Sequence, residues 1–294
     1  MRVDSSRGVV LELHDLGGAA DGPPLLIAHA TGFCARAYEP LALVLGGRGF
    51  HVWGVDFRGH GDSTAPVDGD FRWEGMGDDV LAVADALGAG VGRVLHGFGH
   101  SMGGAALLLA ELARPGLLAS LYLYEPIVLP AGMGEVGEPP PLAAAARRRR
   151  PEFPTRADAM YRYALRPPLS VLRADSLAAY VEHGFAELVD TGTCDMVVRL
   201  KCLPDHEAAT FAAEPKLTVA EIVSGRLAVP SVVVGAGGVE GPAGPAAMAP
   251  LVADAIPGAR LVEYPYLGHF GPLQAPELVA ADVVGGAGPG AVQA

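Results

Sequence analysis

The residues best suited to chemistry in this sequence form the short segment Gly99-His100-Ser101-Met102-Gly103. A serine flanked in this way by two glycines is typical of a sharp strand-to-helix turn, which lifts the serine hydroxyl above a sheet. The glycines let neighbouring backbone approach closely. A helix that begins just after the serine supplies partial positive charge and a free N–H at Met102. The segment therefore predicts a nucleophilic serine, Ser101.

The residues around this segment favour that interpretation over a chance match. The chain has 40 glycines, so the five-residue pattern alone is a weak signal. However, the apolar run 94–96 predicts a strand before it, and residues 102–113 predict a helix after it. The same glycines do not form a dinucleotide-binding loop, because the third glycine would have to lie near Met102.

Short apolar runs alternate with helix-like stretches along most of the chain. The runs are 9–13, 25–28, 52–55, 94–96, 121–124, 232–234 and 261–262, and the helix-like stretches are 38–45, 77–87, 102–113 and 246–255. Continuous hydrophobicity is typical of strands that are buried on both faces. The alternation predicts an α/β fold with a mostly parallel, doubly wound sheet.

One region breaks this alternation. Between residues 130 and 225 there is little strand signal, and helices are expected over 143–150, 155–164, 169–188 and 204–213. We therefore expect a core of residues 1–129 and 226–284 with an inserted helical cap of residues 130–225. Residues 285–294 are rich in glycine and alanine and are expected to be a flexible tail.

Composition narrows the class of protein. Of 294 residues, half are hydrophobic and 18% are charged, which excludes global disorder. The net charge of −12 argues against nucleic acid as a partner. The three cysteines show no spacing of a disulfide framework, and the sequence shows no apolar leader, which predicts a cytoplasmic protein. No run approaches the roughly 20 apolar residues of a membrane span, so we expect no membrane partner. The run Arg147–Arg150 is expected to be a solvated helix face, with a local anion or partner site as the alternative.

Four motifs, in order along the chain, resemble the α/β-hydrolase superfamily. They are residues 29–33 (His-Ala-Thr-Gly-Phe), 56–63 (Asp-Phe-Arg-Gly-His-Gly-Asp-Ser), the serine segment 99–103, and 267–272 (Leu-Gly-His-Phe-Gly-Pro). In that superfamily these are the oxyanion loop, a structural turn, the nucleophile elbow and the loop of the catalytic histidine. The resemblance covers most of the chain and implies the fold predicted above.

The resemblance also implies site residues. The two oxyanion donors would be the backbone N–H groups of Thr31 and Met102. Ala30 stands where the family usually has glycine, and its small side chain should matter little. Of nine histidines, His269 follows the last predicted strand and would be the base that takes the proton of Ser101. The alternatives are a plain turn at Thr31 and an ordinary loop histidine at position 269.

The acid that orients the histidine departs from the family pattern. The family commonly places an aspartate after the strand ending at Val234, but the next residues are Gly-Ala-Gly-Gly. Glu125 closes the run 120–124 and precedes Pro126, which biases it towards an extended backbone. A carboxylate at the end of a buried strand needs a partner, and some branches of the superfamily place the acid here. We expect Glu125 to be the acid, with Glu240, or neither residue, as alternatives.

The nucleophile limits the reaction. The dehalogenases and epoxide hydrolases of this superfamily use an aspartate at the elbow, so Ser101 argues against both. We expect a serine esterase or lactonase that forms an acyl-enzyme with a small, largely apolar substrate, without cofactor or metal. The aromatic residues of the cap would line the pocket or form the cap's own core. A thioesterase or acyltransferase, a non-catalytic binding protein of this fold, and a homodimer all stay open.

Overall fold

The computed structural model describes residues 1–90, 93–130, 141–189, 194–225, 227–239 and 244–288. Eight strands form the main sheet in the spatial order β1-β2-β4-β3-β5-β6-β10-β11. Their bounds are β1 (Arg2–Asp4), β2 (Val10–Gly18), β3 (Pro24–Ala28), β4 (His51–Asp56), β5 (His96–His100), β6 (Ser120–Tyr124), β10 (Val232–Gly237) and β11 (Arg260–Tyr264). From β4 to β11 neighbouring strands are parallel, while β1 and β2 pair antiparallel with their neighbours.

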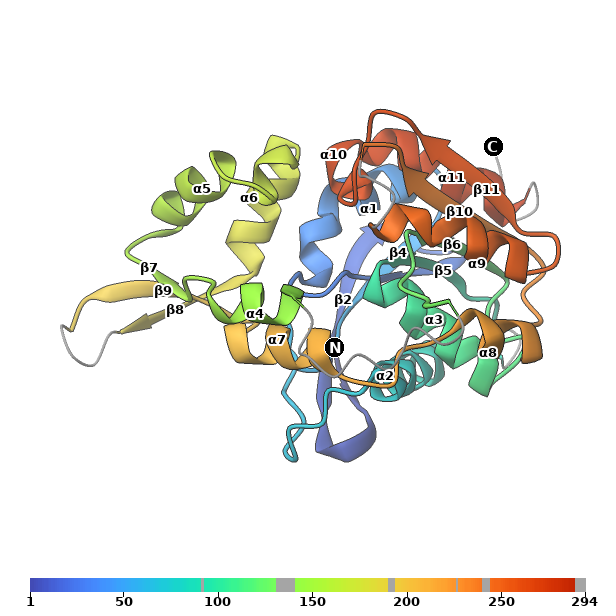
Figure 1. Cartoon of the computed structure of the whole chain (residues 1–294), viewed down its shortest axis with the longest axis horizontal. Helices are drawn as coiled ribbons and strands as arrows, with labels where there is room; N and C mark the ends of the chain where they lie inside the picture. The colour runs from blue at the N-terminus through green and yellow to red at the C-terminus, as the bar shows by residue number, and fades with distance from the viewer. Residues whose placement is uncertain (91–92, 131–140, 190–193, 226, 240–243, 289–294) are drawn as a thin grey trace.

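Helices cover both faces of this sheet (Figure 1). They are α1 (Glu39–Gly47), α2 (Trp73–Ala86), α3 (Met102–Ala113), α8 (Val219–Ser224), α9 (Ala249–Ala255), α10 (Gly271–Gln274) and α11 (Pro276–Ala287), with short 3-10 turns η1 (Ser6–Gly8), η2 (Ala35–Tyr38) and η4 (Pro245–Ala247). One apolar core contains residues of α2, α3, α8 and α9, and a second contains residues of α1 and α11. The prediction of a mostly parallel, doubly wound α/β sheet is confirmed.

The central strands are buried on both faces, as their continuous hydrophobicity predicted. All five residues of β3, β5 and β6 are buried. The β5 strand, however, is His96–His100, and the prediction of a strand at 94–96 is wrong in its bounds. A Cβ atom at Gly97 would lie 2.8 Å from Leu121 Cδ2, so the glycines that resemble a turn in the sequence instead let neighbouring side chains pack over the strand.

The inserted region is not purely helical, so this part of the prediction is wrong. It contains α4 (Pro141–Arg147), β7 (Glu152–Phe153), α5 (Arg156–Ala164), η3 (Leu169–Val171), α6 (Ala174–His183), β8 (Phe185–Val189), β9 (Met196–Leu200) and α7 (Pro204–Ala212). The strands form an antiparallel sheet in the order β7-β9-β8. The expected helix 169–188 ends at His183 because β8 pairs with β9, which places Phe185 and Leu200 opposite each other in the second core.

The inserted region extends to one side of the main sheet, and its helix α6 packs on the sheet side that carries α1 (Figure 1). The boundaries 130–225 stay a prediction, since residues 131–140 and 226 lie outside the described residues. The predicted tail begins too early. Residues 285–287 belong to α11, where Gly286 packs on Val233 of β10, and residues 289–294 lie outside the described part of the chain.

Three buried histidines make the stability of the fold depend on pH. Burial lowers the pKa of His29, lowers that of His60 to about 3, and lowers that of His100 well below its ordinary value. The unfolded chain takes up protons near pH 6.5, whereas the folded chain resists them. These neutral histidines therefore stabilise the fold fully above about pH 6.5, and their contribution is lost as the pH falls towards the folded pKa values.

We expect the free energy of unfolding to fall as the pH decreases below about 6.5. The slope should approach ~1.4 kcal/mol per pH unit for each buried histidine. Urea unfolding between pH 8 and pH 5 measures it. The variant His60→Asn keeps an N–H donor for the Arg58 carbonyl, which His60 Nδ1 contacts at 3.0 Å, and should show a shallower slope. Equal slopes for the variant and the wild type would contradict this account.

Candidate active site

Ser101 lies directly between β5 and α3 in a strained backbone conformation, with φ 56° and ψ −117°. Two backbone hydrogen bonds hold it there: Ser101 N–H donates to Tyr124 O at 3.0 Å, and Ile127 N–H donates to Ser101 O at 3.2 Å. Such a conformation costs roughly 1–3 kcal/mol and persists only where the surroundings enforce it. The serine hydroxyl makes no capping hydrogen bond to α3.

The glycines of the elbow let it pack directly on the end of β3. A Cβ atom at Gly103 would lie 2.1 Å from Ala28 O and 2.7 Å from His29 O. A Cβ atom at Gly99 would lie 2.6 Å from Gly104 Cα. No side chain fits at these distances, so glycine is required at both positions. The close approach brings the loop that begins at His29 beside the first turn of α3.

Glu125 follows β6 and is fully buried. Its carboxylate has two partners: Oε2 contacts Nδ1 of His269 at 2.6 Å, and Oε1 accepts the N–H of Gly237 at 2.7 Å. The expected extended backbone is wrong, because φ of Glu125 is 43°. Glu125 N–H donates to Gly235 O at 2.9 Å, and together with the carboxylate contacts this fixes the unusual conformation despite Pro126.

The loop that carries His269 is held against the ends of β5 and β6. His100 Nε2 donates to the carbonyl of His269 at 2.7 Å, and the Tyr124 hydroxyl donates to Gly268 O at 2.8 Å. The rings of His100 and His269 lie 4.9 Å apart. Since Ser101 follows His100, these contacts place the loop of His269 beside the elbow.

Thr31 and Met102 lie on the two segments that meet at this edge. Parallel pairing of Ala28 with Gly99 aligns the end of β3 with the end of β5. In the loop after β3, Ala30 O accepts the N–H of Phe33 at 3.1 Å and Nδ1–H of His29 at 2.8 Å. Met102 is the first residue of α3, and its side chain is buried. The edge thus holds backbone N–H groups, a serine and a carboxylate–histidine pair.

Some residues of this edge were missed from the sequence. Tyr38 OH donates to His100 Nδ1 at 2.6 Å and accepts the N–H of Ala30 at 3.2 Å, which links the loop after β3 to the elbow. Arg149 Nη2 donates to Tyr180 OH at 2.6 Å. The prediction of a solvated helix face at Arg147–Arg150 is wrong for Arg149, which follows the end of α4 and binds Glu207 and Tyr180. No local signal distinguishes this third arginine, because its partners are distant in sequence.

Asp56 does not pair with Arg58, although the two residues are neighbours in the motif 56–63. The Asp56 carboxylate accepts a hydrogen bond from Ala35 N–H at 2.7 Å and contacts His14 Nε2 at 2.9 Å. The Arg58 side chain turns the other way, to the buried Asp79 of α2, with Nη2 2.7 Å from Oδ1. Asp56 is nevertheless structural, because it ties the end of β4 to the turn before α1.

One group in the described ranges has the residue types of a metal site: His14, Asp56 and Asp62. Their ligand atoms lie within 4.8 Å of one another. The contact between His14 and Asp56 and the ion pair of Asp62 with Lys201, at 2.7 Å, account for these side chains without a cation. We therefore assign them a structural role. The alternative acid, Glu240, lies outside the described residues.

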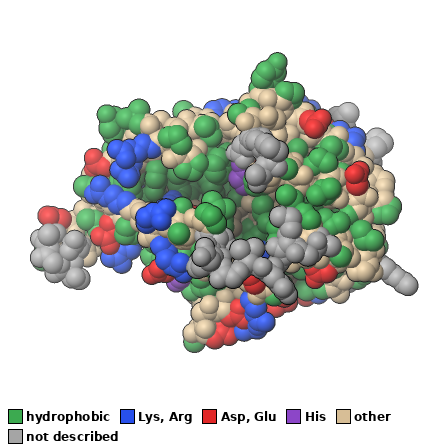
Figure 2. All heavy atoms as spheres, viewed as in Figure 1, with side chains coloured by type: hydrophobic (Ala, Val, Ile, Leu, Met, Phe, Trp, Pro, Cys, Tyr) green, Lys and Arg blue, Asp and Glu red, His purple; other side chains and the backbone are tan. Residues whose placement is uncertain are grey.

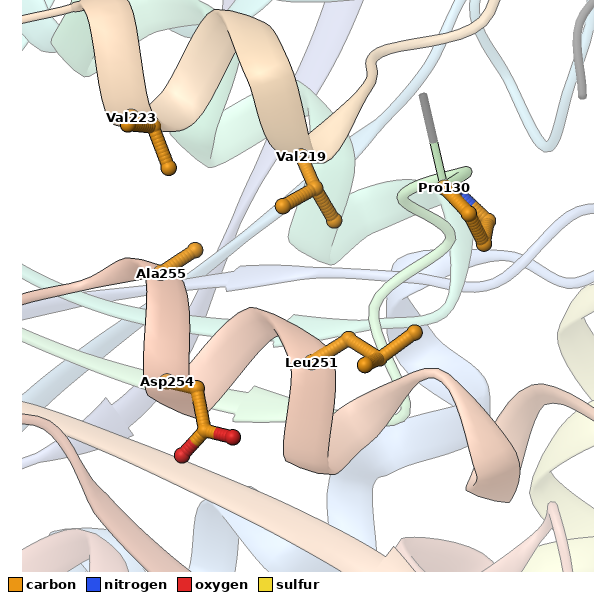
Figure 3. Close-up of a pocket in the computed structure, with 6 residues that line it drawn as sticks. All are labelled: Pro130, Val219, Val223, Leu251, Asp254 and Ala255. Atoms are coloured by element: carbon orange, nitrogen blue, oxygen red, sulfur yellow. The ribbon is translucent and has the colours of Figure 1, made fainter. Parts of the chain in front are cut away.

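Two hollows bear on where a substrate binds. Figure 2 shows a hollow lined by hydrophobic side chains on the face between the α5–α6 pair and the α4–α7 pair. Separately, aromatic rings of the core and of the inserted region pack together: the ring centroid of Phe33 lies 4.9 Å from that of Tyr180 and 5.6 Å from that of Phe270. A second hollow lies between α8 and α9 (Figure 3). Its lining consists of apolar residues and Asp254, without a serine or a histidine, so it lacks the residue types that meet at the edge described above.

A family model for the α/β-hydrolase fold matches residues 23–276. The chain belongs to the α/β-hydrolase fold family. The match includes all four motifs, so the resemblance stated from the sequence is confirmed. Within the described residues, no helix is long and apolar enough to cross a membrane.

Individual relatives match only part of the chain. A putative carbamate hydrolase, RutD, of Variovorax paradoxus is 32% identical over 110 residues, which are 37% of this chain and 40% of that protein. Human monoglyceride lipase is 35% identical over 108 residues, 36% of this chain and 35% of that protein. The matches thus span about two fifths of these relatives or less.

A solved structure extends the likeness in fold to nearly the whole chain. The esterase RhEst1 of Rhodococcus sp. ECU1013 superimposes with a TM-score of 0.71 at 20% identity, covering 98% of this chain and 99% of that one. This similarity applies to the architecture.

Proposed function

We propose that this α/β-hydrolase family member is a serine hydrolase that cleaves carboxylic esters or lactones through an acyl-enzyme on Ser101. The observation that carries the proposal is the 2.6 Å contact between His269 and the buried Glu125, beside a serine in a strained strand-to-helix turn. A buried carboxylate that orients a histidine near a serine is the arrangement that activates a hydroxyl as nucleophile.

The proposed reaction proceeds in two stages. Glu125 binds Nδ1–H of His269, so Nε2 takes the proton as Ser101 Oγ attacks the substrate carbonyl. The negative oxygen of the tetrahedral intermediate accepts hydrogen bonds from the backbone N–H groups of Thr31 and Met102. His269 then protonates the leaving alcohol. In the second stage the same nitrogen takes a proton from a water molecule, which attacks the carbonyl carbon of the acyl-enzyme. The bond to Ser101 Oγ breaks, the carboxylic acid leaves, and His269 returns the proton to Ser101 Oγ.

The hollow supports a small, largely apolar substrate. Phe33 packs against Tyr180 of the inserted region and against Phe270 of the histidine loop, so the contact between the two parts is aromatic and apolar. Burial of apolar surface contributes about 25 cal/mol per Å², so each added methylene on a matching acyl chain should tighten binding until the hollow is filled.

A screen of p-nitrophenyl esters from acetate to decanoate, with γ- and δ-lactones and acyl-thioesters alongside, tests the proposal. We expect ester or lactone hydrolysis with a maximum of kcat/KM at a short or medium acyl chain. Hydrolysis of thioesters alone would move the assignment to a thioesterase. No turnover of any of the three classes would refute a hydrolase of this type.

A further inference from the structure

A chain of hydrogen bonds links a cation in the cap to the oxyanion loop of the core. Arg149 Nη2 donates to Tyr180 OH at 2.6 Å, and Tyr180 OH donates to Gly32 O at 3.2 Å. The N–H of Phe33 belongs to the same peptide group as Gly32 O, and it donates to Ala30 O at 3.1 Å. The peptide group of Ala30 O carries the N–H of Thr31.

The dipoles in this chain all point the same way. In a trans peptide group, the C=O and N–H bonds point in opposite directions. A hydrogen bond accepted by the oxygen is therefore aligned with the hydrogen bond that the N–H of the same peptide group donates. Hydrogen bonds in series polarise one another, and a charged donor at the head strengthens the series. A guanidinium is always protonated in proteins, so Arg149 supplies that charge. The last donor is Thr31 N–H.

The surroundings keep this chain dry and close to the loop. Tyr180 is 1% exposed, so water does not compete for its hydroxyl. The carboxylate of Glu207 holds the other arm of the guanidinium, with Arg149 Nη1 2.5 Å from Oε2. Gly32 has φ 81°, and a Cβ atom there would lie 2.6 Å from Glu207 Oε1. Only glycine lets the cap approach the oxyanion loop this closely.

Other contacts on the same groups do not replace the chain. His29 Nδ1–H is a second donor to Ala30 O, at 2.8 Å, and it is neutral. Tyr163 OH also accepts a hydrogen bond from Arg149 Nη2, at 3.5 Å, but it is the Tyr180 hydroxyl that donates to Gly32 O. Tyr163 is therefore a matched control for Tyr180, since both phenols contact the same guanidinium.

We propose that Arg149 and Tyr180 are positioning residues that orient and polarise the Thr31 N–H through the Gly32 and Ala30 carbonyls, so that the cap contributes to stabilising the oxyanion. This inference rests on the proposed function and adds to it two cap residues that do not touch the reacting atoms. It also predicts that the cap affects the rate of the chemical step as well as the fit of the substrate.

The experiment compares Tyr180→Phe, Arg149→Met and Arg149→Lys with two controls, Tyr163→Phe and Arg156→Met, the latter breaking the cap ion pair of Arg156 with Glu187. For each, kcat and KM are measured with a p-nitrophenyl ester, together with inhibition by phenylboronic acid, whose serine adduct is an anionic tetrahedral analogue of the intermediate. Thermal unfolding reports whether each variant is folded.

We expect Tyr180→Phe and Arg149→Met to lower kcat about tenfold, less than the roughly 10²- to 10³-fold cost of losing a direct oxyanion donor. KM should stay within about twofold, boronate affinity should fall in parallel with kcat, and Arg149→Lys should recover part of the loss. The controls should keep wild-type kcat.

A change confined to KM, an unchanged kcat, or equal losses in Tyr163→Phe and Tyr180→Phe would overturn the proposal. If Tyr180→Phe does not fold, the comparison of Arg149→Lys with Arg149→Met decides, and equal kcat values in that pair overturn it. A wild-type protein that neither turns over the ester nor binds the boronate overturns the proposed function itself.

Discussion

Replacing Ser101 with alanine is expected to lower kcat/KM for a p-nitrophenyl ester by about 10⁴- to 10⁶-fold, because the hydroxyl that forms the acyl-enzyme is lost. Some activity above the uncatalysed rate should persist, since the N–H groups of Thr31 and Met102 remain to bind the oxyanion. Initial-rate kinetics with and without enzyme measure both quantities. The Ser101→Ala protein should stay folded, since the bonds that fix the elbow are made by its backbone.

Ser120→Ala is a matched control for this prediction. Ser120 is 6% exposed and Ser101 is 7% exposed, so both changes remove a hydroxyl from a buried site. Ser120 contacts His96 at the opposite end of β6, away from the catalytic edge. Its loss should lower stability modestly and leave kcat nearly unchanged. Equal activity losses in the two variants would mean that Ser101 acts through the fold alone.

Glu125→Gln is expected to have the second-largest effect, a loss of about 10³- to 10⁴-fold in kcat. A glutamine amide facing Nδ1 of His269 favours the wrong tautomer and no longer stabilises the imidazolium that forms in the reaction. The carboxamide still offers an oxygen to the Gly237 N–H, so the fold should survive. Measurement of kcat across pH 5–9 distinguishes a lost acid from a general loss of folded protein.

Glu111→Gln provides the control for that variant. Glu111 is also a fully buried carboxylate, and it accepts backbone N–H groups of Gly116 and Leu118 at 2.6 and 3.1 Å. It lies on α3, and it also accepts the N–H of Ala228, so its carboxylate binds backbone groups. Its substitution should cost stability but not kcat per folded molecule. If Glu240→Gln proves as damaging as Glu125→Gln is expected to be, the acid follows β10 instead.

The elbow and its base loop could be predicted because short motifs specify them. The segment around Ser101 contains, in order, a strand, the glycines of the turn and a helix. The loop of His269 follows the last strand, and because the strands are parallel, their carboxyl ends meet at one edge of the sheet. The acid was harder to predict, since the choice of Glu125 depended on the absence of an aspartate after Gly235. The structure adds the contact with His269 and a positive φ that the following proline does not suggest.

The parts that escaped prediction depend on contacts between distant residues. The strands β8 and β9 exist because they pair with each other, which no local pattern in a helix-rich segment reveals. The bounds of β5 were missed because Gly97 and Gly99 resemble a turn until Leu121 and Leu107 are seen to pack over the strand. Arg149 belongs to a charged run, and only its approach to Tyr180 and Glu207 separates it from its neighbours.

The account depends most on Ser101 being a reactive nucleophile. Labelling with a fluorophosphonate, followed by mass spectrometry of the peptides, tests this without knowledge of the natural substrate. We expect one adduct, on Ser101, that forms slowly or not at all in His269→Ala and is absent in Ser101→Ala. A wild-type protein that remains unlabelled while folded, or an adduct on a different residue, would contradict the account.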